Sequence, residues 1–158
     1  MKKFIRLYLF GLLLLCCVIV NGAQVPKYIF LFIGDGMGFN HVEATQIYAE
    51  KVGTDTGERS LLFPTFPVLT QVCTRSASHL ITCSSAAATA IATGEKTTNY
   101  VIGMDARKEH GLKSLARQLK DKGYKIGIIT SASIDHATPG GFYASQPDRS
   151  MYYEIGVD

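Results

Sequence analysis

Three short hydrophobic segments separate stretches of mixed polarity along this chain, and each is rich in β-branched or aromatic residues. Segments of this kind, bounded by glycine and polar residues, are typical of strands in a parallel sheet. They occupy residues 28–33, 68–73 and 124–130. The first, YIFLFI, is a continuous apolar run that stops at Gly34-Asp35-Gly36, which predicts a strand buried on both faces.

Helical segments are predicted between these strands. They occupy residues 40–51, 84–93 and 112–119. The second is Ala-rich, the third repeats its apolar residues every three or four positions, and Gly94 and Gly123 follow them as helix stops. Alternating strands and helices predict an α/β fold whose polar residues gather where strands end.

The N-terminal segment predicts export. A positively charged start precedes an apolar run at residues 7–20, which has the length of a signal-peptide core and is shorter than the about 20 residues of a bilayer span. Small residues follow, so residues 1–23 are predicted to be a cleaved signal peptide and residues 24–158 the exported domain. We expect a periplasmic or secreted protein without a stable membrane span, with a retained anchor or a lipid on Cys16 or Cys17 as alternatives.

Removal of this segment changes the charge balance. The chain has 16 Lys and Arg against 13 Asp and Glu, but three of the basic residues lie in the first 23 positions, which leaves 13 of each sign. A neutral remainder gives no support for a nucleic-acid or anionic-membrane partner. The whole chain is 47% hydrophobic, which is enough to bury the core of one modest domain. Cys73 and Cys83 would remain, and the sequence leaves a disulfide between them open.

Two candidate functional residues lie at the ends of predicted elements. Asp35 ends the first strand between two glycines, where a carboxylate can hold a metal ion or simply cap the next helix. Ser84 opens the Ala-rich helix, where free backbone N–H groups favour an anion, although an ordinary N-cap serine is the simpler explanation.

A third group of candidates follows the last predicted strand. His136 and Thr138 come first, and helical residues are expected from about Gly140 towards Arg149, whose guanidinium can hold a phosphate in bidentate fashion. Taken singly, these residues also fit a surface histidine, a helix cap and a solvated arginine.

Taken together, the three stretches resemble the alkaline phosphatase family. The family's motifs occur in order: FIGDGMG at 32–38, SSAAATAIATGEKTTN at 84–99, IGMD at 102–105 and HATPGGFYA at 136–144, with Arg149 at the family's spacing. The resemblance begins at about Lys27 and runs to the end of the chain. It implies an α/β three-layer sandwich with a mostly parallel sheet, here incomplete at the C-terminus.

The resemblance also implies roles by position. Asp35 matches a carboxylate that bridges a zinc ion and the magnesium ion, and Thr138 matches a hydroxyl ligand of the magnesium. His136 matches a position beside the magnesium that is Asp in some members. Ser84 matches the nucleophile that becomes phosphoserine, and Arg149 matches the phosphate-binding arginine. The implied cofactors are two zinc ions and one magnesium ion, with most ligands expected outside this chain.

The implied reaction is hydrolysis of small phosphomonoesters by in-line phosphoryl transfer. In the family's mechanism, zinc stabilises the Ser84 alkoxide and the leaving oxygen, Arg149 holds non-bridging oxygens, and water then attacks the phosphoserine. A homodimer is the family's implied assembly.

Two departures from the family pattern limit these expectations. The residue before the nucleophile is often an Asp that helps to hold the arginine, and here it is Cys83. A Cys beside this Ser is also a feature of the related sulfatases, but their CxPSR signature is missing. The chain stops at Asp158, whereas family members run to several hundred residues.

This length bears on activity. A catalytic zinc usually needs about three protein ligands, so we expect the 158-residue chain by itself to lack meaningful phosphatase activity. The alternatives are a non-catalytic exported fragment and a phosphodiesterase or phosphotransferase of the same superfamily.

Overall fold

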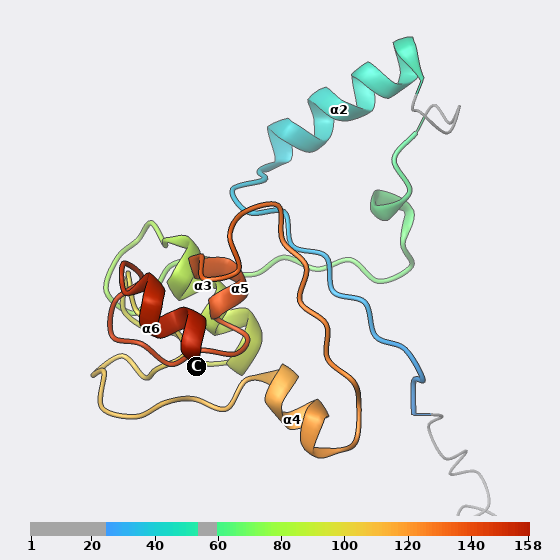
Figure 1. Cartoon of the computed structure of the whole chain (residues 1–158). Coiled ribbons are helices and arrows are strands. Elements are labelled where there is room, and N and C mark those ends of the chain that lie inside the picture. The colour runs from blue at the N-terminus through green and yellow to red at the C-terminus, as the bar shows by residue number, and fades with distance from the viewer. Residues whose placement is uncertain (1–24, 54–59) are drawn as a thin grey trace, which may run out of the picture. The chain divides into compact units, whose positions relative to one another are not determined.

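The computed structural model describes residues 25–53 and 60–158 (Figure 1). It divides into two units, the first ending at Ile33 and the second running from Gly34 to Asp158. The predicted signal peptide, residues 1–23, lies outside the described residues. All the candidate functional residues belong to the second unit.

The described residues form α-helices and one short 3₁₀ helix. They are α2 (Phe39–Val52), η1 (Phe63–Thr65), α3 (Ser84–Thr93), α4 (Leu115–Asp121), α5 (Ala137–Gly140) and α6 (Tyr152–Val157).

Helices α2 and α3 confirm the sequence prediction to within one residue at each end. α2 begins after Gly38, whose N–H donates a hydrogen bond to His41 Nδ1 at 3.2 Å. α3 ends at Gly94, which takes a left-handed φ of 80° and donates its N–H to the Ala90 carbonyl at 2.9 Å. Glycine adopts this conformation without steric cost, which is why it serves as a helix stop.

Helix α4 is shorter than predicted. Ser114 precedes it, and the Ser114 hydroxyl accepts a hydrogen bond from the Arg117 N–H at 3.2 Å, so the helix starts at Leu115 and Leu112 lies outside it. A serine cap of this kind satisfies one of the free N–H groups of the first turn. Gly123 follows the helix with a φ of 88°, as its role as a stop requires.

The prediction of helical residues from about Gly140 towards Arg149 is wrong. α5 ends at Gly140 and turns follow it. The pair Gly140-Gly141 lowers helix propensity, and Pro147 further along lacks the N–H that a helix would use.

Close packing between α3 and α5 explains why two glycines are needed there. A Cβ atom on Gly141 would come within 2.8 Å of the Ala88 Cβ on α3. A Cβ atom on Gly140 would come within 3.1 Å of Ile155 on α6. Small residues thus let α3 and α6 approach α5 closely.

The core of the second unit lies beside this contact. Its buried cluster comprises Ile102, Ala137, Ala144 and Ile155, with Tyr143 packed against it. Residues from the loop after α3, from α5 and from α6 therefore share one core. This core fixes the elements that carry most of the candidate site.

Buried hydrogen bonds join α3 to the loop that follows it. The Thr89 hydroxyl donates to the Ser85 carbonyl at 2.8 Å and accepts from the Gly103 N–H at 2.9 Å. Ile102 and Gln146 then exchange two backbone hydrogen bonds, at 3.0 and 2.9 Å, in an isolated antiparallel bridge. The loop after α3 and the segment after α5 are thereby held together.

The three predicted strands do not form a sheet in this structure. Residues 28–33, 68–73 and 124–130 are non-helical chain in Figure 1, and no strand is assigned within residues 25–53 and 60–158. A strand is stable only when a neighbour pairs with its N–H and C=O groups. The described part of the chain supplies no such neighbour, so the apolar pattern alone does not produce the parallel sheet.

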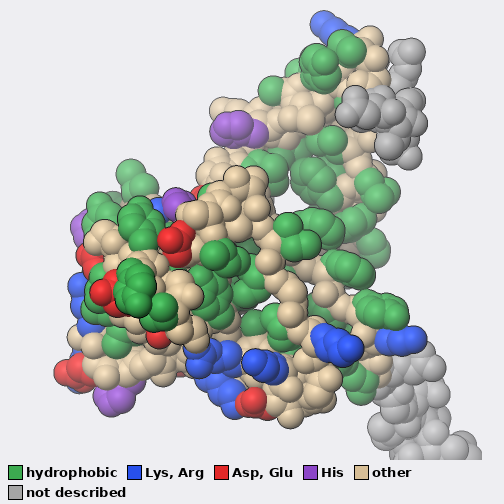
Figure 2. Space-filling view, viewed as in Figure 1, with side chains coloured by type: hydrophobic (Ala, Val, Ile, Leu, Met, Phe, Trp, Pro, Cys, Tyr) green, Lys and Arg blue, Asp and Glu red, His purple; other side chains and the backbone are tan. Residues whose placement is uncertain are grey.

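Hydrophobic side chains of these segments are exposed as a result. Phe32 is 90%, Val68 83% and Ile129 99% exposed. Figure 2 shows hydrophobic side chains over much of the visible surface, among few charged ones. Within the described ranges, no helix has the length and apolar character needed to cross a bilayer.

Candidate active site

A tight turn presents Asp35. The Met37 N–H donates to the Gly34 carbonyl at 3.1 Å, and Gly36 takes a φ of 70° that favours glycine. A Cβ atom on Gly34 would meet the Met37 side chain at 2.8 Å, so the close folding of this turn depends on glycine at both sides of the aspartate. The Asp35 side chain is exposed and available for contacts with other elements.

Asp35 joins two of the other predicted site residues. The Ser84 hydroxyl donates to Asp35 Oδ1 at 3.1 Å, and the Thr138 hydroxyl donates to Asp35 Oδ2 at 2.9 Å. The partners lie 49 and 103 residues further along the chain. The structure thus brings together three residues that were selected from separate sequence motifs.

Ser84 is the first residue of α3 rather than its N-cap. Cys83 takes the N-cap position, and its side chain makes no capping hydrogen bond. The Ser84 hydroxyl is directed to Asp35 instead, so the simpler interpretation as a capping serine is wrong. Its place in the first turn leaves backbone N–H groups and the positive end of the helix dipole close by, which favours an anion there.

His136 and Arg149 form the second part of the site. His136 precedes α5, two residues before Thr138, and Arg149 Nη2 donates to His136 Nε2 at 3.4 Å. Because a guanidinium can only donate, this contact requires an unprotonated Nε2 on the histidine. His136, at the N-cap of α5, and Thr138, within α5, therefore bring the two pairs to the same end of this helix.

Backbone contacts also fix Arg149. Its N–H donates to the Tyr100 carbonyl at 2.7 Å. Tyr100 in turn donates its own N–H to the Cys83 sulfur at 3.1 Å. Sequence reasoning missed Tyr100, since nothing in the residue type indicates its φ of 72°, which is uncommon for a residue with a side chain.

Cys83 lies in a polar environment beside the serine. Burial raises the pKa of its thiol, but hydrogen bonds from the Ser85 hydroxyl and from the backbone N–H groups of Tyr100, Ala86 and Ser85 outweigh it, so the pKa is lowered overall. The Ser85 hydroxyl is 3.0 Å from the sulfur. Both Cys73 and Cys83 are free thiols, so the disulfide that the sequence left open is not formed in this structure.

The donor atoms at Asp35 suit a hard cation. One carboxylate and two hydroxyl groups offer oxygen ligands of the kind that magnesium prefers. Zinc favours nitrogen and sulfur ligands and normally takes about three from the protein. No group of three or more His, Cys, Asp or Glu residues that could hold a metal occurs in the described part of the chain. The described residues therefore fit part of a magnesium site and do not form a zinc site.

A buried oxygen lies next to His136. Asp135 Oδ1 has no hydrogen-bond partner within the described residues, and neither has the buried Asn99 Oδ1. Buried polar atoms are normally paired, so these two oxygens are exceptions near the site.

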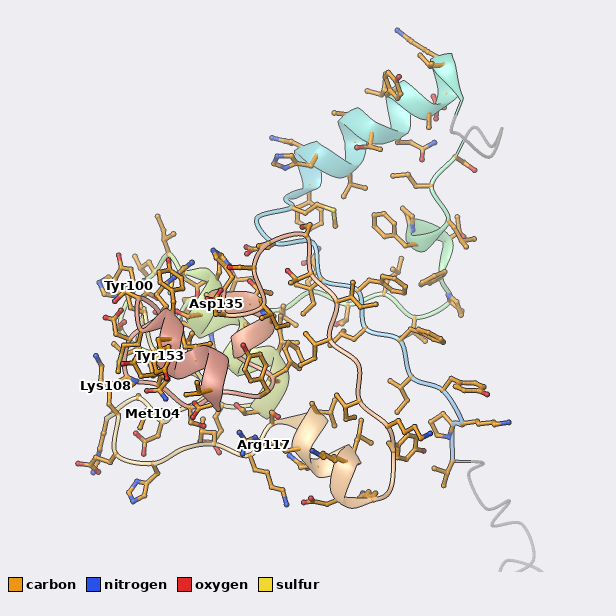
Figure 3. All side chains as sticks on the ribbon, in the orientation of Figure 1. Tyr100, Met104, Lys108, Arg117, Asp135 and Tyr153 are labelled. Carbon is orange, nitrogen blue, oxygen red and sulfur yellow. The ribbon has the colours of Figure 1, made fainter. Side chains whose placement is uncertain are left out.

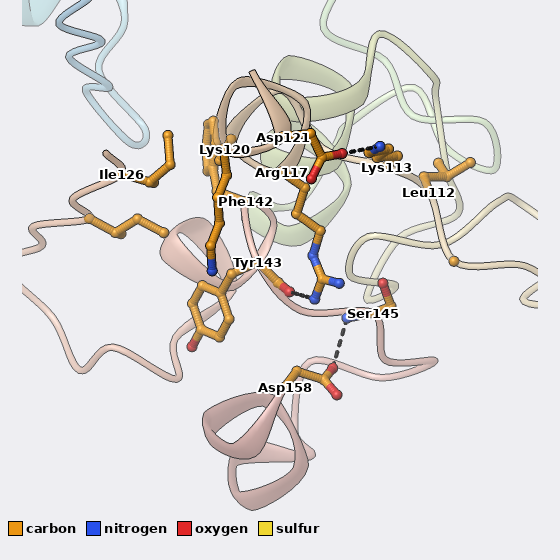
Figure 4. Close-up of a pocket in the computed structure, with 13 residues that line it drawn as sticks. Leu112, Lys113, Arg117, Lys120, Asp121, Ile126, Phe142, Tyr143, Ser145 and Asp158 are labelled. Atoms are coloured by element: carbon orange, nitrogen blue, oxygen red, sulfur yellow. Dashed lines mark hydrogen bonds and ion pairs between the residues drawn. The ribbon is translucent and has the colours of Figure 1, made fainter. Parts of the chain in front are cut away.

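The cavity in Figure 4 is separate from this site. It has a volume of about 900 Å³ and is lined by α4, the segment after it and residues near the C-terminus. Two of its basic groups are already paired, since Lys113 contacts Asp121 and Arg117 donates to the Tyr143 carbonyl. None of the five predicted site residues lines it.

A comparison with known protein families matches residues 26–158 to the alkaline phosphatase model. The chain belongs to the alkaline phosphatase family. The match includes Asp35, Ser84, Thr138 and Arg149, and so covers both parts of the site.

Named relatives support the family assignment. The tissue-nonspecific alkaline phosphatase isozyme of Rattus norvegicus is 33% identical over 139 residues, which cover 82% of this chain and 26% of that protein. Alkaline phosphatase 4 of Drosophila melanogaster is 36% identical over 139 residues, or 83% of this chain and 23% of that protein. The chain thus spans about a quarter of the length of these relatives.

Solved alkaline phosphatases have a similar structure. The enzyme from the Antarctic bacterium TAB5 is 30% identical, with a TM-score of 0.71 over 84% of this chain and 36% of that chain. The Thermus thermophilus enzyme is 29% identical, with a TM-score of 0.68 over 80% of this chain and 26% of that chain. Alkaline phosphatases have an α/β fold, and a variant of the TAB5 enzyme was solved with magnesium bound. These neighbours support the α/β class and metal cofactors for the family in general.

Proposed function

We propose that this chain contributes the nucleophile and the phosphate-binding arginine of a phosphomonoester hydrolase. The observation that carries the proposal is the pair of hydrogen bonds by which Ser84 and Thr138 contact opposite oxygens of Asp35. A carboxylate shared by two hydroxyl groups at the start of a helix is suited to orienting a nucleophile and binding a cation.

In this proposal Ser84 Oγ attacks the phosphorus of the substrate. A bond forms between Oγ and phosphorus as Oγ gives up its proton, the bond to the leaving oxygen breaks, and that oxygen takes up a proton to depart as the alcohol. Water later attacks the phosphoserine, which releases orthophosphate and returns a proton to Ser84 Oγ. The hydroxyl proton of Ser84 points to Asp35 Oδ1, which leaves the Oγ lone pairs free for attack. Asp35 thus orients the nucleophile as well as binding a cation.

Arg149 binds the non-bridging oxygens of the phosphoryl group. Its guanidinium is planar and permanently charged, so it can hold two of these oxygens at once. The contact with His136 Nε2 uses one Nη atom and leaves the other donors of the guanidinium for the substrate. The first turn of α3 adds a favourable field for the same anion.

Magnesium is the cofactor that the described residues fit. Asp35 and Thr138 would hold it, with His136 beside it, and the bound cation would stabilise negative charge in the site. The family resemblance adds two zinc ions: Asp35 would bridge one of them to the magnesium, and most of the other zinc ligands are proposed to lie outside this chain. For that reason we expect steady-state turnover by the 158-residue chain alone to stay at background.

The remaining parts of the proposal follow the family. We propose small phosphomonoesters as substrates, export to the periplasm or the medium after removal of residues 1–23, and a parallel-sheet sandwich completed by strands that the described residues do not supply. A homodimer is part of the same proposal. The similarity to alkaline phosphatases over residues 26–158 supports the substrate class and the sandwich. The charged start and the apolar run of residues 7–20 support export.

A chimera tests whether these residues can serve in catalysis. Residues 26–158 would replace the matching segment of the TAB5 enzyme, and phosphate release from a generic phosphomonoester would be measured with zinc and magnesium present. We expect activity that falls at least about 10³-fold in Ser84→Ala, since the nucleophile is lost. Ser131→Ala, which removes the hydroxyl of an exposed serine, is the matched control.

Other results would favour the alternatives. Activity that survives Ser84→Ala would contradict the proposed nucleophile. Preference for a phosphodiester over the monoester would favour a phosphodiesterase. A folded chimera that releases no phosphate, together with an inactive isolated chain, would favour the non-catalytic fragment.

A further inference from the structure

A chain of hydrogen bonds links the residue before the nucleophile to the phosphate-binding arginine. The Cys83 sulfur accepts the Tyr100 N–H at 3.1 Å, and the Tyr100 carbonyl accepts the Arg149 N–H at 2.7 Å. A single residue therefore separates Cys83 from the backbone of Arg149. Tyr100 is labelled in Figure 3, in the loop that follows α3.

Tyr100 has a conformation that needs support from its neighbours. Its φ of 72° lies in the left-handed region, which is uncommon for residues other than glycine. Its side chain is 56% exposed and gives the backbone little packing support. The hydrogen bonds on its N–H and its carbonyl are thus well placed to hold this conformation.

Cys83 connects this segment to the nucleophile directly. It is the N-cap of α3, and Ser84 is the next residue, so the sulfur that holds Tyr100 and the hydroxyl that attacks phosphorus are on adjacent residues. On the other side of Tyr100, Ile102 is fully buried and is paired with Gln146. That pair fixes the segment to the core, and Cys83 fixes it to the start of α3.

We propose that Cys83 is a positioning residue, which sets the place of Arg149 relative to Ser84 through the backbone of Tyr100. This inference rests on the proposed function, because it assumes that Arg149 and Ser84 act on one phosphoryl group. The thiol acts on the backbone of the arginine. The guanidinium stays free of a carboxylate partner at position 83 and contacts His136 instead.

The test measures the affinity of the 158-residue chain for inorganic phosphate in the presence of magnesium. Cys83→Ala removes the acceptor with little change in volume, and the affinity should fall about fivefold, the size expected for one hydrogen bond. Cys83→Ser restores an acceptor at the same position and should recover most of the affinity. Cys73→Ala, which removes the other described thiol, should leave the affinity unchanged.

A double-mutant cycle separates positioning from a general structural role. If Cys83 acts through Arg149, Cys83→Ala should have no further effect on phosphate affinity in an Arg149→Ala background. The same loss in both backgrounds would overturn the proposal. So would a Cys83→Ala variant that binds phosphate as well as the wild type, or a Cys83→Ser variant that binds no better than Cys83→Ala.

Amide hydrogen exchange gives a second readout that does not depend on phosphate. The Tyr100 and Arg149 amides should exchange faster in Cys83→Ala than in the wild type and Cys83→Ser, while the Ile102 amide, bonded to Gln146, should be unchanged. If the wild type binds no phosphate, the proposed phosphate contact of Arg149 fails in this chain, and exchange alone decides the link. Equal exchange at Tyr100 in wild type and Cys83→Ala would then overturn it. Where Cys83→Ala does not fold, Cys83→Ser decides. A folded Cys83→Ser variant that matches Cys73→Ala in affinity and exchange would support the acceptor role. A Cys83→Ser variant that does not match would oppose it.

Discussion

Helices α2 and α3 were predicted with similar accuracy, but they are held very differently. α2 has 14 residues and buries one of them, Ala49. α3 has 10 residues and buries five, namely Ser85, Ala86, Ala88, Thr89 and Ala92. Local signals are thus enough to define where each helix lies, whereas its contribution to stability depends on a packing partner. Within the described residues, α3 packs against other helices, principally α5.

The candidate site spans this difference. Ser84 and Thr138 lie on α3 and α5, which pack together, whereas Asp35 lies in an exposed turn just before α2. Two hydrogen bonds from the packed helices hold the carboxylate. Matched substitutions in the packed and the exposed parts of the chain therefore test this comparison.

The largest effect is expected from alanine at Gly103. Its φ of 56° is unfavourable for alanine, and the new Cβ would lie 2.0 Å from the Ala144 carbonyl oxygen. We expect Gly103→Ala to lower the free energy of unfolding by on the order of 4 kcal/mol. Gly127→Ala is the control, because nothing lies within 4 Å of its Cβ position, and it should change stability by less than about 0.5 kcal/mol. Thermal and urea unfolding followed by circular dichroism would measure both, and equal effects would contradict the division into packed and exposed parts.

This contrast also shows which features the sequence could predict. Gly94 and Gly123 were identified as helix stops because their role depends only on nearby residues. The steric requirement for glycine at positions 103 and 141 was not predicted. It arises because a side chain there would collide with Ala144 or Ala88, which are distant in the sequence.

The same limit applies to the strands and to the site. The apolar run at 28–33 predicts a strand, but a ladder also needs a neighbour, which no local pattern supplies. The meeting of Asp35 with Ser84 and Thr138 was anticipated only through the family resemblance. The resemblance also tied position 83 to the arginine, but the route from Cys83 to Arg149 was not anticipated, because it passes through backbone atoms of Tyr100.

A second pair of substitutions tests the core itself. Ile155 is fully buried with Ile102 and Ala137, so Ile155→Ala should lower the free energy of unfolding by about 3 kcal/mol through lost burial and a cavity. Ile129 is 99% exposed, and Ile129→Ala should change the free energy of unfolding by less than about 0.5 kcal/mol. Urea denaturation of both variants measures the difference. A loss of several kcal/mol in Ile129→Ala would mean that residues 124–130 are packed in solution.

A third pair compares one type of hydrogen bond in the two helices. The Thr89 hydroxyl on α3 and the Thr45 hydroxyl on α2 each donate to the carbonyl four residues earlier, at 2.8 and 2.7 Å. Thr89 is fully buried and also accepts the Gly103 N–H, so Thr89→Val leaves that donor unpaired and should cost about 2 kcal/mol. Thr45→Val, at an exposed position, should cost less than about 0.5 kcal/mol. Similar unfolding midpoints for the two variants would show that burial of Thr89 does not matter.

The smallest effect concerns a charge in the loop between α3 and α4. Hydrogen bonding from the Glu109 N–H, which outweighs burial, lowers the pKa of Asp105, and contacts with His110 and the Arg107 N–H act in the same direction. Because the folded pKa lies below the ordinary value of 3.8, the stabilisation is present above that pH and is lost as the pH falls through the lowered pKa. The protection of the Arg107 and Glu109 amides, taken relative to their intrinsic exchange rates, should therefore fall below about pH 3.8, and Asp105→Asn should remove this dependence. Protection that falls equally in Asp105→Asn would show that the acid transition begins elsewhere, in the core or in the exposed segments, and that this loop merely follows it.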